Sequence, residues 1–392
     1  MNRPFAGVNV LEFSTAVAGP YAGQLLADWG AEVVKVEPPG GATERNTVPH
    51  IHHMLNRGKR SLCVDLKSDE GLALVHELVD THVDVVLVNY RPSVLGQFAL
   101  DYESLRSRDE SLVFCSLTGF GDDGPYSDRP ALDPIAQALS GLMAMTGEPD
   151  RKPSRIGGSI IDIGAATNAV LGITMALWQR DRTGQGQKVE ASLFETAFGW
   201  GGEWGTYYTL HGEVPRRMGS KKASYAPVGA YEARDGLVYV AAFGDPAFER
   251  LCAALGRDDL TEDSRFAGPE DRTANREELD AILEAEMETF SREGLVDRLL
   301  EYNIPAARIN EVPEVLEDPH LQARDMILEM ESAATDRQVR VPSTPLVLSG
   351  SESVDSTDLP GLGEHSAALA RELGYSAAEI DRLRDEGILD AE

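Results

Sequence analysis

The stretch that decides the fold is GGSIIDIGAATNAVLGITMALWQRDRTGQGQKVEASLFETAF, residues 157–198. It opens with two glycines, a serine and two isoleucines, and its first acid is Asp162. After Asp162, apolar residues recur at helical spacing on one face, which predicts a buried helix. Charged residues and the glycine-bearing turn 183–187 are expected to end this helix, and the alternating residues 188–193 predict a strand. The stretch is therefore expected to be a loop, an acid, a buried helix, a tight turn and a strand, with Asp162 alone at the junction of loop and helix.

Two interpretations of Asp162 follow from its place at the junction of loop and helix. Aspartate is a preferred N-cap residue, because its carboxylate accepts hydrogen bonds from the first backbone N–H groups of a helix. The same carboxylate could instead be a covalent nucleophile. A helix N-terminus favours the charged form, so we expect an ionised carboxylate at neutral pH. Spacing alone does not choose between the two.

The N-terminal segment predicts a parallel strand–helix–strand unit. Residues 8–13 alternate in polarity and predict a strand, a helix follows at about 21–29, and residues 32–37 predict a second strand. At this spacing the two strands are expected to be parallel, with a right-handed crossover. No G-x-G-x-x-G follows the first strand, so a dinucleotide cofactor is not expected.

Polar residues follow another predicted strand. The apolar run 83–88 predicts a buried strand, and Asn89, Tyr90 and Arg91 come directly after it. Ligands of open parallel sheets bind beyond the carboxyl ends of strands, so these residues are well placed for ligand contact. The earlier block 56–62 holds three closely spaced cations, which form either a solvated turn or part of a binding site.

Length and composition indicate a globular protein with two domains or one intertwined unit. The chain has 392 residues, of which 42% are hydrophobic and 26% charged. Cys63, Cys115 and Cys252 lie far apart, so neither a zinc site nor a disulfide framework is expected, and a reducing cytoplasm fits. We expect a cytoplasmic protein, because no targeting segment or membrane-spanning run is evident.

The formal net charge is −29, and the acids are spread along the whole chain. Such a charge repels phosphates, so we expect neither nucleic acid nor an anionic membrane surface as a partner. A dispersed acidic excess is typical of proteins adapted to high salt, which predicts a halophilic source.

The residue composition of the sequence changes after Trp200. We expect a large domain from residues 1–200, a linker at 201–224, a small domain at 225–320, and a return segment at 321–392 that completes the large domain. Within the small domain, Arg234-Asp235-Gly236 between two alternating runs predicts a hairpin.

Four blocks of this chain together resemble the class III CoA-transferases, the family that includes formyl-CoA transferase, carnitine CoA-transferase and the α-methylacyl-CoA racemases. The blocks are A-G-P at 18–20, K-V-E-P-P-G at 35–40, the K-R-S and D-L-K pair within 59–67, and R-x-x-T-G-x-G-Q at 180–187. The resemblance implies a Rossmann-like parallel-sheet large domain, a small α+β domain and an interlocked homodimer. It also identifies Asp162 as the catalytic nucleophile, which is compatible with a capping position.

The implied reaction moves CoA from an acyl-CoA, in this family often succinyl-CoA, to a small carboxylic acid. Dicarboxylates such as mesaconate or malate are the expected acceptors. The implied intermediates are an aspartyl anhydride and an aspartyl-CoA thioester, which divide a hard transfer into easier steps. No metal or redox cofactor is implied, because the CoA thioester is a substrate.

The resemblance implies a set of CoA contacts, and the basic residues after the large domain suggest an acceptor site. The CoA contacts are Val17, Val64, Asp65, Leu66, Lys67, Asn89, Tyr90, Arg91 and Asp133. Gln97 stands where the family often has a basic residue, so one phosphate contact is in doubt. The cations that could hold an acceptor carboxylate, or be solvated linker charges, are Arg216, Arg217, Lys221 and Lys222.

Two other functions compete with CoA transfer. A racemase needs an acid–base group on each face of the substrate carbon, and the related racemases place a histidine where this chain has Leu132. A non-enzymatic CoA-binding subunit has no use for an intact Asp162. Both alternatives are therefore disfavoured by single residues.

Overall fold

A computed structural model describes residues 3–332 and 337–390, which fold into two compact units. The large unit runs to Ser140, resumes over Gly157–Gly202, and resumes again from Pro319. The small unit comprises Gly141–Ile156 and Glu203–Asp318. The protein is thus a mixed α/β chain in which the large unit is built from three separate segments.

These boundaries differ from the expected ones at two places. Residues 141–156 belong to the small unit, although the sequence places them in the large domain. The expected linker 201–224 contains a helix, α11 (Gly202–His211), and nearly all of it belongs to the small unit. No proline interrupts this helix and Pro215 follows it, so the segment is free to be helical despite its glycines.

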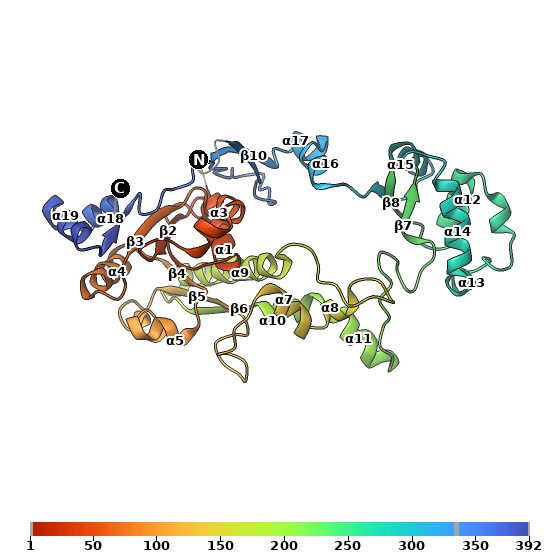
Figure 1. The fold of residues 1–392 in the computed structure, drawn as a ribbon. Helices are drawn as coiled ribbons and strands as arrows, with labels where there is room; N and C mark the ends of the chain where they lie inside the picture. Colours follow the sequence, from red (N-terminus) through yellow and green to blue (C-terminus); the bar gives the residue numbers. More distant parts are fainter. Residues whose placement is uncertain (1–2, 333–336, 391–392) are drawn as a thin grey trace. The chain divides into compact units, whose positions relative to one another are not determined.

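A seven-stranded sheet forms the core of the large unit (Figure 1). Its order is β12-β3-β2-β1-β4-β5-β6, and all neighbours are parallel except β12, which is antiparallel to β3. Chain order runs outward in both directions from β1, so the switch point of this doubly wound sheet lies between β1 and β4. The strands are β1 (Asn9–Phe13), β2 (Glu32–Glu37), β3 (Arg60–Val64), β4 (Val85–Val88), β5 (Val113–Thr118), β6 (Lys188–Ser192) and β12 (Leu389–Asp390).

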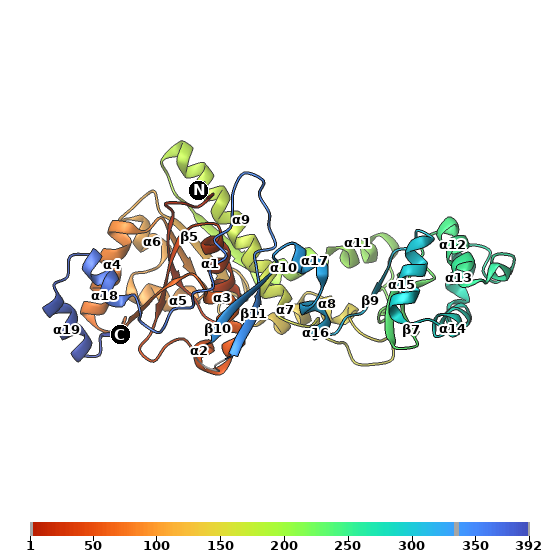
Figure 2. The same cartoon turned by 90° about the horizontal axis from the view of Figure 1, so that it is seen from above.

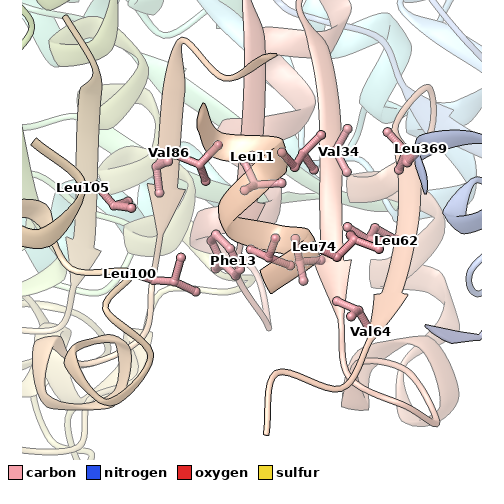
Figure 3. Close-up of a cluster of buried hydrophobic side chains, with 14 of the residues drawn as sticks. Leu11, Phe13, Val34, Leu62, Val64, Leu74, Val86, Leu100, Leu105 and Leu369 are labelled. Atoms are coloured by element: carbon pink, nitrogen blue, oxygen red, sulfur yellow. The ribbon is translucent and has the colours of Figure 1, made fainter. Parts of the chain in front are cut away.

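Helices cover both faces of the sheet, so its strands are buried on both sides, including the charged side chains of Glu12 and Lys35 on one of them. On one face, α4 (Asp69–His82) and the C-terminal helices α18 (Ser366–Glu372) and α19 (Ala377–Asp385) contribute to the cluster drawn in Figure 3. There Leu11, Val34 and Leu74 are at most 7% exposed. Burial of each such side chain stabilises the fold by about 1.5–3 kcal/mol.

The other face is covered by α1 (Ala18–Asp28) and α9 (Ile160–Thr183), which lie side by side (Figures 1 and 2). Small residues of α9 face inward, and Gly164 and Gly172 have no room for a side chain. An added Cβ would lie 2.2 Å from the Trp200 ring and 2.4 Å from Val189, respectively. The Ala- and Gly-rich sequence of α9 therefore allows it to lie close to its neighbours.

α9 is also the one described helix that is long and apolar enough to cross a membrane. By length and composition alone this is weak evidence, because core helices pass the same test. Its contacts with α1, β5 and β6 are those of a core helix.

Shorter helices and a hairpin complete the large unit. The hairpin pairs β10 (Ile327–Ser332) with β11 (Arg337–Pro342). The helices are α2 (Thr43–Thr47), α3 (Pro49–Asn56), α5 (Pro92–Leu95), the 3-10 turn η1 (Gly96–Phe98), α6 (Tyr102–Arg106), α7 (Asp133–Leu139), α10 (Leu193–Trp200) and α17 (Pro319–Ala323).

The small unit has a three-stranded antiparallel sheet with helices around its own core. The hairpin predicted at Arg234-Asp235-Gly236 is confirmed, since Ala233 pairs with Gly236 in β7 and β8. The elements are α8 (Leu142–Met145), α11, β7 (Val228–Ala233), β8 (Gly236–Ala241), α12 (Asp245–Leu255), the 3-10 turn η2 (Asp258–Thr261), α13 (Pro269–Ala274), α14 (Arg276–Met287), α15 (Arg292–Glu301), β9 (Ala306–Arg308) and α16 (Val312–Leu316).

Two expected elements of the large unit begin elsewhere than predicted. The helix expected at about residue 21 already starts at Ala18, because a proline, here Pro20, is tolerated in the first turn. The strand expected at 83–88 starts at Val85. The Asp84 side chain before it accepts a hydrogen bond from the backbone N–H of Asn9 at 2.8 Å and forms an ion pair with Arg180 at 2.9 Å. The parallel pairing of the first two strands is confirmed.

Candidate active site

The N-terminus of α9 lies at the carboxyl edge of the parallel sheet. α9 leads into β6, which is parallel to β5, and a crossover helix runs against the direction of the strands it connects. Its first turn is therefore at the edge where β1, β3 and β4 end. This is the edge at which open α/β sheets bind ligands.

Asp162 is the third residue of α9 and not its N-cap, so the capping interpretation was wrong. Ser159 occupies the N-cap position, and its side chain makes no capping hydrogen bond. The other end of the helix matches expectation, because Gly184 is left-handed (φ 73°) and its N–H donates to the carbonyl of Arg180 at 2.7 Å.

The capping role belongs to Asp133, the first residue of α7. Its Oδ2 accepts from the backbone N–H of Ile161 at 2.7 Å and from that of Asp162 at 3.3 Å. Its Oδ1 accepts from Nε2 of Gln137 at 2.5 Å, and the residue is only 4% exposed. An acid from another helix thus satisfies N–H groups that every helix N-terminus leaves without partners.

The pKa of Asp162 is raised to about 7, chiefly by burial and then by the negative charge of Asp133, while a hydrogen bond from Ser159 acts in the opposite direction. The ionised carboxylate expected at neutral pH is therefore only one of two states of this side chain. The helix N-terminus favours charge, but desolvation and a like charge outweigh it here. Near pH 7, protonated and ionised Asp162 coexist.

Asn89 and Val17 meet at the switch point of the sheet. The Asn89 amide binds both backbone groups of Thr15: its Oδ1 accepts from the N–H at 2.9 Å and its Nδ2 donates to the carbonyl at 2.7 Å. This double contact holds the loop before α1, in which Ala16 has a left-handed backbone (φ 62°) and Val17 is buried. Asn89 shapes this loop, and its contact with CoA stays a prediction.

The segment 64–67 follows β3 at the same edge. Val64 points into the sheet's apolar cluster and is 1% exposed, whereas Lys67 is exposed. Asp65 orders the turn, since its Oδ1 accepts from the backbone N–H of Lys67 at 2.9 Å. Leu66 is partly buried against the same cluster. Of the four, Lys67 is the side chain best placed to meet an anion.

Tyr90, Arg91 and Gln97 lie after β4. Tyr90 is partly buried and lines a cavity of about 210 Å³. Arg91 is exposed, and its guanidinium donates to the carbonyl of Asp128 at 3.3 Å. Gln97 is exposed and its amide donates to the carbonyl of Ser93 at 3.2 Å. Arg91 and Lys67 are thus the exposed cations among the predicted CoA contacts.

The cation-rich block is not a solvated turn. Lys59 is buried and donates to Glu12 Oε2 at 2.8 Å, and burial lowers its pKa to about 8. Arg57 is buried against Asp28 at 2.6 Å. Arg60 pairs with Glu372 at 2.8 Å and also with Glu32. Sequence analysis missed these pairings because each partner is distant in the chain.

The four cations that could hold the acceptor differ in their contacts within the small unit. Arg217 donates to the carbonyls of Ala144, Glu148 and Arg151 at 3.0, 3.4 and 2.8 Å. Lys221 forms an ion pair with Asp280 at 2.6 Å. Arg216 and Lys222 are exposed. Arg217 and Lys221 thus have structural partners.

The chain belongs to CoA-transferase family III, whose model matches residues 5–366. It is 38% identical to the succinyl-CoA–D-citramalate CoA-transferase of Chloroflexus aurantiacus, with 99% of this chain and 98% of the relative covered. It is 36% identical to the succinate–glutarate CoA-transferase of Agrobacterium fabrum (94% and 96%). It is 35% identical to the succinyl-CoA:mesaconate CoA-transferase of Haloarcula hispanica (94% and 96%).

A solved structure shares the fold. A CaiB/BaiF family protein from Brucella suis superposes with a TM-score of 0.87 at 37% identity, covering 95% of this chain and 100% of that one. Among the known relatives are CoA-transferases named for succinyl-CoA with citramalate, mesaconate or malate. The family assignment made from the motifs is therefore confirmed.

Proposed function

We propose that the protein transfers CoA from succinyl-CoA to a small dicarboxylic acid, such as mesaconate or malate, with Asp162 as covalent nucleophile. The relatives' names support the reaction and the substrate class. The observation that carries the residue assignment is the place of Asp162: a half-buried carboxyl in the first turn of α9, at the edge of the sheet where ligands bind.

In the first half-reaction an Asp162 oxygen attacks the thioester carbon. The C–S bond breaks, CoA leaves as thiolate, and a mixed anhydride remains on Asp162. The thiolate then attacks the aspartyl carbonyl, which releases succinate and forms an aspartyl-CoA thioester. Every step forms an oxyanion that backbone N–H groups can stabilise. Gly157 and Gly158 are candidates for such donors.

In the second half-reaction the acceptor carboxylate attacks the aspartyl-CoA thioester. CoA thiolate leaves again, and a new anhydride joins Asp162 to the acceptor. Attack of the thiolate on the acceptor's carbonyl gives the product thioester and restores the Asp162 carboxylate. Each covalent step replaces one difficult transfer by easier ones.

We assign CoA binding to the carboxyl edge of the large unit. Lys67 and Arg91 would meet phosphates, and Val17, Tyr90 and the backbone of 64–67 would line the site. The Asp133 carboxylate is buried and accepts three hydrogen bonds, which favours a role toward Asp162 over direct CoA contact. Exposed Arg216 and Lys222 are the better candidates for the acceptor's second carboxylate.

We also propose a homodimer. Large exposed apolar side chains on a single protein usually mark an interaction surface, and several lie on α7, α9 and α10 of the large unit and at the N-cap of α7. They are Leu132, Ile135, Leu139, Leu171, Met175, Trp178 and Phe198. Light scattering during size-exclusion chromatography tests this, and a mass of one chain would contradict it.

Substrate-dependent trapping tests the proposed function. Incubated with succinyl-CoA without acceptor, the enzyme should lose activity to hydroxylamine, which converts an activated Asp162 to a hydroxamate visible by peptide mass mapping. Enzyme without acyl-CoA should be unaffected. Asp162→Ala and Asp162→Asn should lose at least about a thousandfold in turnover. A modified residue other than Asp162, or α-carbon deuterium exchange without CoA transfer, would refute the assignment.

A further inference from the structure

We propose that Asp133 is the positioning residue of Asp162, and that its negative charge favours the acylated over the free form of this side chain. The inference rests on the proposed role of Asp162 as nucleophile. Asp133 would act by holding the backbone of Asp162 and by repelling its charged state.

The Asp133 carboxylate contacts the backbone of the proposed nucleophile. Its Oδ2 accepts from the N–H of Asp162 at 3.3 Å and from that of the preceding Ile161 at 2.7 Å. Ser159, the N-cap, makes no capping hydrogen bond with its side chain, so Asp133 is the side chain that satisfies these N–H groups. Gln137 fixes the other oxygen of Asp133 at 2.5 Å. These contacts orient the first turn of α9.

Asp133 is also the charge that Asp162 responds to. Among the described residues, Asp133 is the charged group that raises the pKa of Asp162, and its effect is second to that of burial. Other titratable groups stand on α9 and on the elements packed against it, and none of them is among the causes of the raised pKa of Asp162. They are Tyr21, Asp28, Cys115, Arg180, Asp181, Arg182, Lys188, Glu190 and Glu195. Asp28 pairs with Arg57, and Glu195 with Ser192.

Protonation and acylation have the same electrostatic effect on Asp162, since each replaces a charged carboxylate by a neutral group. When Asp162 attacks a thioester, the negative charge leaves its side chain with the CoA thiolate. The repulsion by Asp133 is relieved in the anhydride and again in the aspartyl-CoA thioester. The same repulsion that makes Asp162 more basic therefore raises the equilibrium constant for acylation. A more basic carboxylate is also a stronger nucleophile.

Asp133→Asn separates the charge from the hydrogen bonds, because asparagine retains a carbonyl oxygen for the N–H groups. A capping role alone predicts an unchanged pH midpoint for acylation in this variant. The charge role predicts that the midpoint moves about one pH unit or more toward acid. The charge role also predicts that the amount of acyl-enzyme at pH 8 falls about tenfold for each pH unit by which the midpoint moves.

The experiment is a pH series of single-turnover acylation, in which succinyl-CoA and CoA are mixed with enzyme and the intact chain is weighed after acid quench. Asp84→Asn is the matched control, because Asp84 also accepts a backbone N–H and pairs with Arg180 near the other end of α9, about 27 Å along the helix. This control should keep the wild-type midpoint.

Unchanged midpoint and acyl-enzyme yield in a folded Asp133→Asn protein would overturn the inference while leaving the proposed function intact. If Asp133→Asn does not fold, Asp133→Ser is used, since its hydroxyl accepts an N–H without charge, with the same expected result. Acyl-enzyme formation in Asp162→Asn would instead overturn the proposed function itself.

Discussion

At the residue scale, the raised pKa of Asp162 links its proposed catalytic role to the stability of the fold. Its pKa is about 7 in the fold, against an ordinary value of 3.8 for an aspartate side chain. Between these values the folded chain retains a proton that the unfolded chain has lost, so stability falls as pH rises through this window. Above pH 7 the ionised carboxyl destabilises the fold by up to ~4 kcal/mol. The fold thus keeps the proposed nucleophile at a cost in stability.

We therefore expect Asp162→Asn to be inactive and more stable than wild type at alkaline pH. Asparagine has no charge to desolvate or to be repelled by Asp133. Thermal unfolding followed by circular dichroism should show a gap of several degrees at pH 8 that narrows toward pH 5. Asp84→Asn, which breaks the ion pair with Arg180, should lose stability at pH 8 instead. A gap of equal size at both pH values would contradict the raised pKa.

At the element scale, a buried ion network joins β1, β2, α1 and the residue before β3. Lys59 donates to Glu12 and to the carbonyl of Pro20 at 2.8 Å each, and Lys35 donates to Glu12 at 3.4 Å and to the carbonyl of Ser14 at 3.0 Å. The last contact holds the loop that leads to α1. This buried charge pairing thus fixes a loop that lies beside the proposed CoA site.

Removing one partner of this network should be costly, because a buried charge loses its counter-ion. We expect Lys59→Met to lower the free energy of unfolding by about 3–5 kcal/mol. The double variant with Glu12→Gln should recover part of the loss. Arg60→Gln, in the same block but at a partly exposed pair, should cost less than ~1 kcal/mol. Urea titrations measure all three, and equal losses in Lys59→Met and Arg60→Gln would argue against the network.

The same scale shows what local sequence can predict. The helical spacing after Asp162, the glycine end at Gly184 and the hairpin at Gly236 are local patterns, and each is present. The capping of α9 by Asp133 is not local, because Asp133 lies 28 residues before the Ile161 N–H that it accepts. The cations near Lys59 were ambiguous for the same reason, since their partners are set by sheet order.

The residues of the site could be predicted only where a sequence motif contains them. Asp162 could be singled out as an acid at the start of a helix, and the family resemblance suggested the role that we propose for it. Its pKa could not be foreseen, because burial and the charge of Asp133 are properties of packing. Asn89 shows the same limit: its position after a strand was readable, but its two hydrogen bonds to the Thr15 backbone were not.

At the scale of the whole molecule, the net charge of −29 sets the response to salt. Like charges spread over one surface repel each other, and this repulsion opposes the folded state. It reaches far in dilute buffer, where the Debye length is about 30 Å at 0.01 M, and only about 3 Å at 1 M. Several arginines already pair with acids, yet the acids far outnumber them.

We therefore expect the unfolding temperature and the CoA-transfer rate to rise from 0.01 M to 1 M KCl. Sucrose at matched osmolality is the control, because it stabilises proteins by exclusion from their surface but screens no charge. A rise in KCl that sucrose does not reproduce would identify screening as the cause. Most of the rise should be complete by about 0.1 M, where the Debye length has fallen to about 10 Å. Equal unfolding temperatures in dilute and molar KCl would contradict adaptation to high salt, and the acidic excess would then need a cause other than salt.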